Sequence, residues 1–273
     1  MSAELFLIPF LTGLACAIVL PVLGCYLRLR DEWLAALAYS HVAAAGALLA
    51  LLAGVPPVLG GLSMATLAGA GRRLFAQRLS GGASDALLLV GGWAIAVLLA
   101  ANAPMAERMG HALFDGQLYF AGSQELWPVA IGGVVALLAL RALTSRLLLA
   151  RVYPDLFRLR GLSAWPIQIG FDLMAALCLA LATMSLGVMG AFALVFIPPW
   201  LAFRRAANWR SGLRWSLAIG VVAYVAAFAL ALRLNNIRLK FSTGSTSLSL
   251  SSVTRTVLTI SPGAKVSVPD WSR

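Results

Sequence analysis

Eight apolar segments, each close to the length that crosses a lipid bilayer, recur along the chain. They cover residues 5–27, 33–53, 56–71, 85–102, 127–145, 167–184, 187–203 and 215–232. The hydrocarbon core of a bilayer is about 30 Å thick, which roughly 20 helical residues span, and a helix satisfies its own backbone hydrogen bonds there. We therefore expect an all-α fold over residues 1–236, a polytopic integral-membrane bundle of about eight transmembrane helices.

Composition points the same way. Hydrophobic residues make up 61% of the 273 residues and charged residues 11%. A water-soluble domain of this length could not hide that much apolar surface. The three cysteines lie inside apolar segments and have no disulfide or zinc-binding spacing, so we interpret them as small apolar fillers.

Arginine is concentrated in alternate links between the apolar segments. The links after the first, third, fifth and seventh segments hold Arg28 and Arg30; Arg72, Arg73 and Arg78; Arg146, Arg151, Arg158 and Arg160; and Arg204, Arg205, Arg210 and Arg214. The other links hold Arg108 as their only basic residue. Because basic residues accumulate in cytoplasmic loops, this alternation places the N-terminus outside and the arginine-rich links in the cytoplasm. The net charge of +11 then needs no nucleic-acid partner.

The chain changes character after Asn236. Residues 237–273 are rich in serine and threonine and contain both lysines of the protein, Lys240 and Lys265. Such a segment cannot span a membrane. Two interpretations stay open: a native polar tail, disordered or strand-forming, or the product of a reading-frame shift or cloning scar.

Enzyme motifs are missing from the sequence. There is no GxxxxGK[ST] phosphate loop, and no lysine precedes Lys240. Neither HExxH nor GxSxG occurs, and two histidines in total exclude a histidine-rich metal site. We therefore expect no catalysis by this chain, and any ATP hydrolysis belongs to another one.

Two ionisable residues inside the predicted spans are the candidate metal contacts. His41 lies about eight residues into the second span, roughly 12 Å deep, beside the hydroxyls of Tyr39 and Ser40. Asp172 lies about one and a half turns inside the sixth span. Ionisable groups at such depth are functional hypotheses, and imidazole nitrogen and carboxylate oxygen bind divalent metals. The alternative is structural: a histidine bonded to a neighbouring helix and a hydrogen-bonded carboxylate.

Other acidic residues receive simpler interpretations. Asp31 and Asp85 immediately precede or open apolar segments, where a carboxylate caps a helix and meets the positive end of its dipole. One long outer loop holds a second group, which we interpret mainly as solvated charge: Glu107, His111, Asp115 and Glu125.

From about residue 8 to 232, the order of motifs resembles the permease subunits of ABC importers for zinc, manganese and iron. A basic link precedes a helix with a serine–histidine pair and small residues, here residues 39–47, YSHVAAAGA. Small segments follow at 54–61, an aspartate precedes the fourth span at Asp85, and an aromatic–glycine segment lies at 118–123. The glycine-rich turn at 185–191 leads into Ile197-Pro198-Pro199, as in that family.

The most specific resemblance is the segment 152–162, VYPDLFRLRGL, which looks like the family's coupling loop. In that family the loop docks on the ATPase. Two departures stand out, Ala45 where the family often has proline and Phe157 where it usually has a small residue. The ATPase contacts that the resemblance implies are Pro154, Asp155, Leu156, Phe157, Arg158, Leu159, Arg160 and Gly161.

The resemblance implies the membrane-spanning subunit of an ATP-driven metal importer in a bacterial inner membrane. It implies a homodimer, a separate ABC ATPase that binds ATP, and an extracytoplasmic metal-binding protein. The divalent ion is the transported substrate, with no permanently bound cofactor, and zinc, manganese and iron stay equally open. The alternatives are a non-transporting chain, truncated or frameshifted, and a secondary transporter, which would need further charged pairs at mid-membrane.

Overall fold

The computed structural model describes residues 4–76, 82–116, 123–152 and 165–233. Contacts divide the chain into two compact units, Met1–Val225 and Ala226–Arg273. The helix bundle lies in the first unit. In the second unit, residues 226–233 are helical, and the predicted polar tail 237–273 falls outside the described residues.

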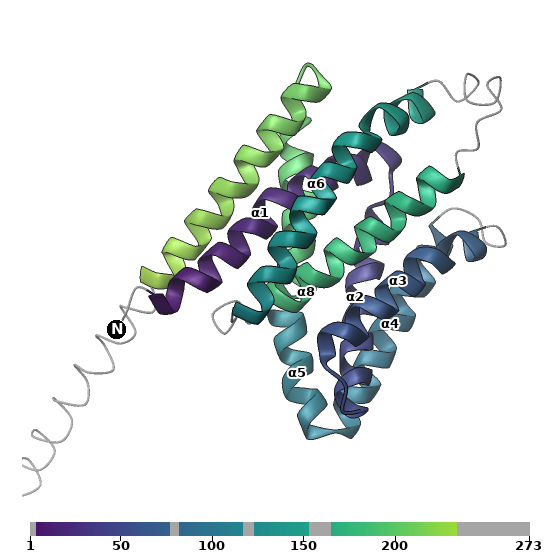
Figure 1. Ribbon diagram of the computed structural model, residues 1–273, viewed down its shortest axis with the longest axis vertical. Coiled ribbons are helices and arrows are strands. Elements are labelled where there is room, and N and C mark those ends of the chain that lie inside the picture. Colours follow the sequence, from purple (N-terminus) through teal and green to yellow (C-terminus); the bar gives the residue numbers. More distant parts are fainter. Residues whose placement is uncertain (1–3, 77–81, 117–122, 153–164, 234–273) are drawn as a thin grey trace, which may run out of the picture. The chain divides into compact units, whose positions relative to one another are not determined.

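Every regular element in the described part of the chain is a helix, and none is a strand (Figure 1). The labelled helices are α1 (Glu4–Arg30), α2 (Trp33–Leu52), α3 (Pro57–Ala76), α4 (Ala83–Asn102), α5 (Pro104–Asp115), α6 (Ser123–Val152) and α8 (Trp165–Ala202). A last helix covers Trp209–Arg233. The predicted all-α, polytopic membrane bundle is confirmed.

Six described helices are long and apolar enough to cross a bilayer, and they include α8, which is 38 residues long. At 1.5 Å per residue α8 measures about 57 Å, nearly twice the hydrocarbon thickness. Its helix is interrupted at Gly187, where φ is 79° and ψ is 166°. The predicted sixth and seventh spans are therefore the two halves of α8. The predicted third span lies in α3, a helix that is not among the six.

The outer loop expected between residues 102 and 127 was wrong in part, because it contains helix α5. Pro104 occupies the first turn, where its missing N–H is harmless. Ala106 and Leu113 are buried against α2, α4 and α8, while Glu107 and Arg108 are exposed. Helix α5 is thus amphipathic, and its 12 residues are too few to span a bilayer.

Helix α2 is the most enclosed of the described membrane spans, because 78% of the residues in its most apolar stretch are buried. It packs against α3, α4, α5 and α8, whereas α1 packs mainly against α6 and α8. Small residues permit this close packing: a Cβ on Gly46 would lie 2.5 Å from the Gly60 carbonyl oxygen, and one on Gly92 2.8 Å from the Val42 nitrogen. Close backbone contact drives helix association where lipid replaces water.

The outer faces of the bundle are apolar. In α4 and in α6, only 22% of the residues in the most apolar stretch are buried. Large apolar side chains on these helices are exposed, such as Trp93, Leu98, Trp127 and Leu138. Patches of this extent are rare on soluble monomers, whereas lipid tails accommodate them. The chain is therefore a multi-pass membrane protein.

Candidate functional site

His41 lies in the third turn of α2 and is buried, with 6% of its surface exposed. Its Nδ1 lies 2.8 Å from the carbonyl oxygen of Leu37, one turn earlier. Because a carbonyl only accepts, Nδ1 carries the proton, and the lone pair of the neutral ring is then on Nε2. A histidine held in this way is oriented as metal-binding histidines commonly are.

The surroundings of His41 are apolar. Its ring lies 5.7 Å from that of Phe114 near the end of α5, and the buried cluster beside it is formed mainly by alanine and leucine from α2, α4 and α5. Across the described residues, no group of three or more histidine, cysteine, aspartate or glutamate side chains could hold a metal ion.

The side chains of Tyr39 and Ser40, which precede His41 in α2, point in other directions around the helix axis than His41 does. Tyr39 is two residues earlier and so points about 200° around the helix axis from His41. The Tyr39 ring is 1% exposed and interacts electrostatically with Asp172, Arg72, Glu32 and Asp85 instead. Within the described part of the chain, neither the Tyr39 hydroxyl nor the Ser40 hydroxyl has a hydrogen-bond partner.

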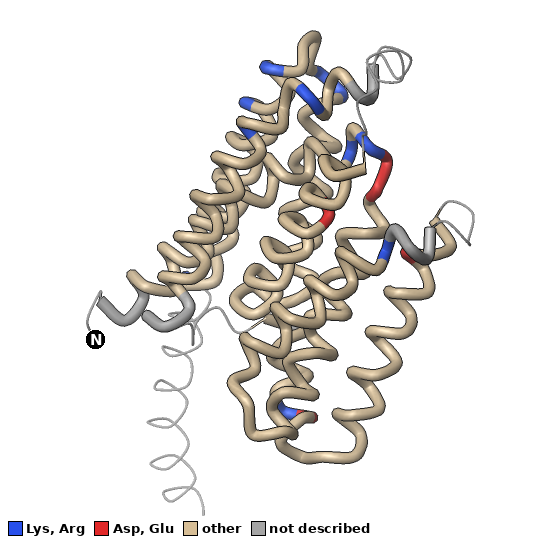
Figure 2. Tube along the Cα trace, turned by 45° about the vertical axis from the view of Figure 1, so that its right-hand side comes forward, with Lys and Arg blue, Asp and Glu red and all other residues tan. Residues whose placement is uncertain are grey.

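Asp172 belongs to a second polar site, which we call the ionic cluster. It lies at the arginine-rich end of the bundle, where α1 and α3 end and α2, α4 and α8 begin, and Figure 2 shows basic residues gathered there. The ionic cluster joins four helices and the α1–α2 junction. Its members are Arg30, Glu32, Arg72, Asp85 and Asp172.

Arg72 of α3 is the centre of the ionic cluster. Its Nε and Nη2 bond to the two carboxylate oxygens of Asp85 at 2.5 and 2.8 Å, a bidentate pair. Its Nη1 lies 3.2 Å from Glu32 and 3.4 Å from Asp172. Such a planar fork matches carboxylate geometry and stays charged at any physiological pH. Arg72 and Asp85 are only 8% and 4% exposed, so each depends on the other for compensation.

Arg30 supplies the second cation of the ionic cluster. Its Nη2 lies 3.1 Å from Asp172, its Nε lies 2.7 Å from Glu32, and its guanidinium stacks 4.6 Å above the Phe171 ring. Asp172, 1% exposed, is thereby bound by arginines from α1 and α3. The structural alternative for Asp172 thus has direct geometric support.

The predicted capping roles of Asp31 and Asp85 were wrong. Glu32 occupies the N-cap of α2 and Gly82 that of α4, and neither helix has a side-chain cap bond. Asp31 adopts a left-handed φ of 60° in the turn after α1. Asp85 lies in the first turn of α4, where its charge suits the dipole, but its oxygens bind Arg72.

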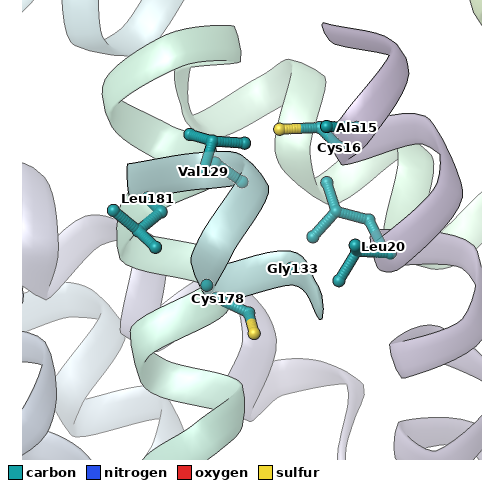
Figure 3. A pocket seen from close by; sticks show the side chains of 10 residues that line it. Ala15, Cys16, Leu20, Val129, Gly133, Cys178 and Leu181 are labelled. Atoms are coloured by element: carbon teal, nitrogen blue, oxygen red, sulfur yellow. The ribbon is translucent and has the colours of Figure 1, made fainter. Parts of the chain in front are cut away.

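Hollows also lie between the described helices. A cavity of about 20 Å³, room for one water molecule, lies between α1, α6 and α8 and is lined by Cys16, Leu20, Val129, Cys178 and other small or apolar residues (Figure 3). A groove of about 300 Å³ on α2, α3 and α4 is lined only by apolar residues and glycine. The cavity offers two thiols and the groove offers no nitrogen, oxygen or thiol side chain, so neither gathers three metal-binding side chains among the described residues.

Comparison with known proteins decides the family. The family model described as "ABC 3 transport family" matches residues 2–254, most of the chain. The chain belongs to the ABC 3 transport family. Its match to the ABC 3 model continues past residue 236, into the region predicted as a polar tail.

Individual ABC 3 relatives and solved structures agree. A Haemophilus influenzae protein named "Probable iron transport system membrane protein" is 26% identical over 190 residues, 69% of this chain and 70% of that protein. PsaBC from Streptococcus pneumoniae in complex with Fab matches with a TM-score of 0.73 and 18% identity, covering 85% and 84% of the two chains. An inward-facing ABC transporter assigned to the metal-chelate type matches with a TM-score of 0.66 and 17% identity, covering 83% and 77%.

As an ABC 3 protein, the chain is a membrane permease of the metal-type ABC transporters. The predicted coupling loop, residues 154–161, lies outside the described residues, in the stretch between α6 and α8. Sequence reasoning identified Asp172 but missed its partners Arg30 and Arg72. The available signal was a carboxylate inside a span together with arginines in several links at the same predicted membrane side.

Proposed function

We propose that this chain is the transmembrane subunit of an ATP-driven importer for divalent transition-metal ions in a bacterial inner membrane. It works as a homodimer with a separate ABC ATPase and receives its ion from an extracytoplasmic binding protein. Zinc, manganese and iron are all candidate substrates, because imidazole nitrogen and carboxylate oxygen suit each of them. The ion is cargo and not a resident cofactor.

The observation that carries this proposal is the ABC 3 family match over residues 2–254. The name of the Haemophilus influenzae relative, an iron transport system membrane protein, supports a metal as cargo. The sequence of this chain offers no phosphate loop, which supports ATP hydrolysis on a partner. Residues 154–161 remain the proposed contact with that ATPase.

His41 is our proposed contact along the metal path. Its bond to Leu37 fixes the ring and presents the Nε2 lone pair, and a single imidazole binds an ion weakly enough to release it. Asp172 could act on the same path only after Arg30 and Arg72 release it, because these two arginines compensate its buried charge here.

The test is reconstitution of the purified chain in liposomes with an ABC ATPase and binding protein identified from neighbouring genes. Uptake of radioactive zinc, manganese and iron is measured with ATP, without ATP, and with an ATPase variant that cannot hydrolyse it. We expect uptake of at least one metal only with ATP and active ATPase. No uptake of any of the three by a correctly assembled complex would overturn the proposal.

The same vesicles separate the secondary-transporter alternative. Uptake that persists without ATP and collapses when a protonophore removes the proton gradient would identify a gradient-driven carrier. The described charged pairs lie at helix ends rather than at mid-membrane, because Arg30 is in the last turn of α1 and Asp85 in the first turn of α4. This placement favours the ABC importer.

A further inference from the structure

We infer that the ionic cluster is a conformational latch, which holds α3 against α8 in the state seen here and opens during transport. The opening step rests on the proposed transport function, whereas the holding role can be tested without transport. The relevant contacts involve three buried side chains: Arg72 of α3, Asp85 of α4 and Asp172 of α8.

Distances within the ionic cluster show where it can separate. The bidentate Arg72–Asp85 pair, at 2.5 and 2.8 Å, ties α3 firmly to α4. The Arg72–Asp172 contact is longer, at 3.4 Å, and uses a single nitrogen. Since charge-assisted bonds weaken with length and misalignment, the contact with α8 is the one that yields first. The Arg72–Asp85 pair between α3 and α4 would then stay closed.

Small residues form the packing of α3 against α8 beside the Arg72–Asp172 contact. Gly69 lies one turn before Arg72, and a Cβ built on it would lie 3.1 Å from the Asp172 carbonyl oxygen and 3.2 Å from the Ala176 Cβ. Helices α3 and α8 therefore approach closely through glycine and alanine at this point. The Arg72–Asp172 contact adds a charged link beside this close approach.

Buried charges make such a contact two-state. Asp172 is 1% exposed, and moving Arg72 away inside the protein leaves Arg30 as its only described arginine contact, which weakens the compensation of this buried charge. Water entering from the arginine-rich end removes that penalty, so the closed and hydrated arrangements are both favourable and the intermediate is not.

The holding role is tested by cross-linking. The variants Gly69→Cys and Ala176→Cys would have Cβ atoms 3.2 Å apart, somewhat closer than the mean Cβ separation in a disulfide, about 3.8 Å. Both are made in a background in which the buried Cys16, Cys25 and Cys178 are replaced by alanine. Oxidation is followed by counting free thiols with a polyethylene glycol maleimide. We expect fast cross-linking, slowed at least about tenfold by Asp172→Asn or Arg72→Gln. Unchanged rates in both variants would overturn the latch.

Arg28→Gln is the matched control for these substitutions. Arg28 is in the last turn of α1, like Arg30, but it lies over the Phe203 ring at 5.2 Å and makes no described ion pair. Its replacement should leave the cross-linking rate unchanged, and a slowing equal to that of Asp172→Asn would attribute the effect to general loosening. Size-exclusion chromatography restricts the comparison to variants that assemble normally. Two cluster variants are made, Asp172→Asn and Arg72→Gln, so that the test still stands if one of them does not assemble.

The opening step is tested in the transporting complex. With both introduced thiols oxidised, metal uptake should fall at least about tenfold and return on reduction, while each single-cysteine variant should be insensitive to oxidant. Undiminished uptake by the oxidised pair would overturn opening. If no metal is transported even by the parent chain, the proposed function fails, and the cross-linking result still decides the holding role by itself.

Discussion

His41 and the ionic cluster both lie against α2, yet they are built in opposite ways. His41 is a neutral ring among alanine, leucine and Phe114, with one hydrogen bond to its own helix. The ionic cluster places five charged groups from four helices and one junction in mutual contact. Tyr39 and His41, two residues apart, face these two environments.

The difference follows from the free energy of burial. A neutral imidazole with one hydrogen bond can be buried at modest cost and keeps a lone pair for a visiting cation. A guanidinium or carboxylate in the same place needs a partner of opposite charge, and neither group of the pair is then free to bind a cargo ion. His41 is therefore suited to transient contact with cargo, and the ionic cluster is suited to holding helices together.

The largest expected effect is loss of stability when one partner of the ionic cluster is removed. Arg72→Leu leaves Asp85 without its bidentate partner and Asp172 with Arg30 as its only described arginine contact. Breaking a buried pair typically costs about 3–5 kcal/mol, so the melting temperature in detergent, followed by tryptophan fluorescence, should drop steeply.

The double variant Arg72→Leu with Asp85→Leu sharpens this prediction. Removing both charges leaves no unpaired carboxylate on α4, and replacing a whole buried pair with apolar groups is often neutral. The double variant should therefore melt well above the Arg72→Leu single variant. If it melts below it, the Arg72–Asp85 pair stabilises through packing and not through charge compensation.

A smaller effect is expected at the α8 break, on the His41 side of the comparison. Gly187 combines φ 79° with ψ 166°, a region almost exclusive to glycine, and an added Cβ would lie 2.6 Å from the Gly116 nitrogen. Gly187→Ala should cost about 2–3 kcal/mol. Gly190→Ala, where an added Cβ would lie 3.4 Å from Leu186 Cβ, should not lower the melting temperature. Equal melting of the two variants would contradict strain at the break.

Helix positions were predictable because a membrane span needs about 20 consecutive apolar residues, a signal that lies within one stretch of sequence. A break close to Gly187 was predicted too, because the sixth span was expected to end at residue 184 and the seventh to begin at residue 187. Helix α5 was missed because 12 residues with Glu107 and Arg108 on one face read as a polar loop. Amphipathic spacing at Ala106, Met109 and Leu113 was the overlooked signal.

Which residues pair within the ionic cluster was not predictable from local sequence. Asp172 pairs with Arg30, 142 residues away, and with Arg72, 100 residues away, so no local spacing connects them. Asp85 was interpreted as a cap because it opens an apolar segment, and a local role was the only one that local sequence could indicate. Tertiary packing placed Arg72 within reach and decided otherwise.

The smallest effect on stability, with a large effect on transport, is expected for His41→Gln. Glutamine keeps the size and a hydrogen-bond donor, and losing an interhelical or local bond in lipid costs only about 1 kcal/mol or less. A neutral amide, however, binds transition metals poorly. Uptake of radioactive zinc and manganese, at equal amounts of membrane-inserted protein, should fall while the melting temperature stays close to that of the parent chain.

His41→Leu separates the ligand role of His41 from its hydrogen bond to Leu37. Leucine lacks both the metal ligand and the donor, so under the ligand role it should transport no better than His41→Gln. A structural histidine would give a different order, because glutamine could still satisfy the Leu37 carbonyl and would restore uptake, whereas leucine would not. Parent-level uptake by His41→Gln, with loss only in His41→Leu, would make His41 a packing residue and remove the functional half of its contrast with the ionic cluster.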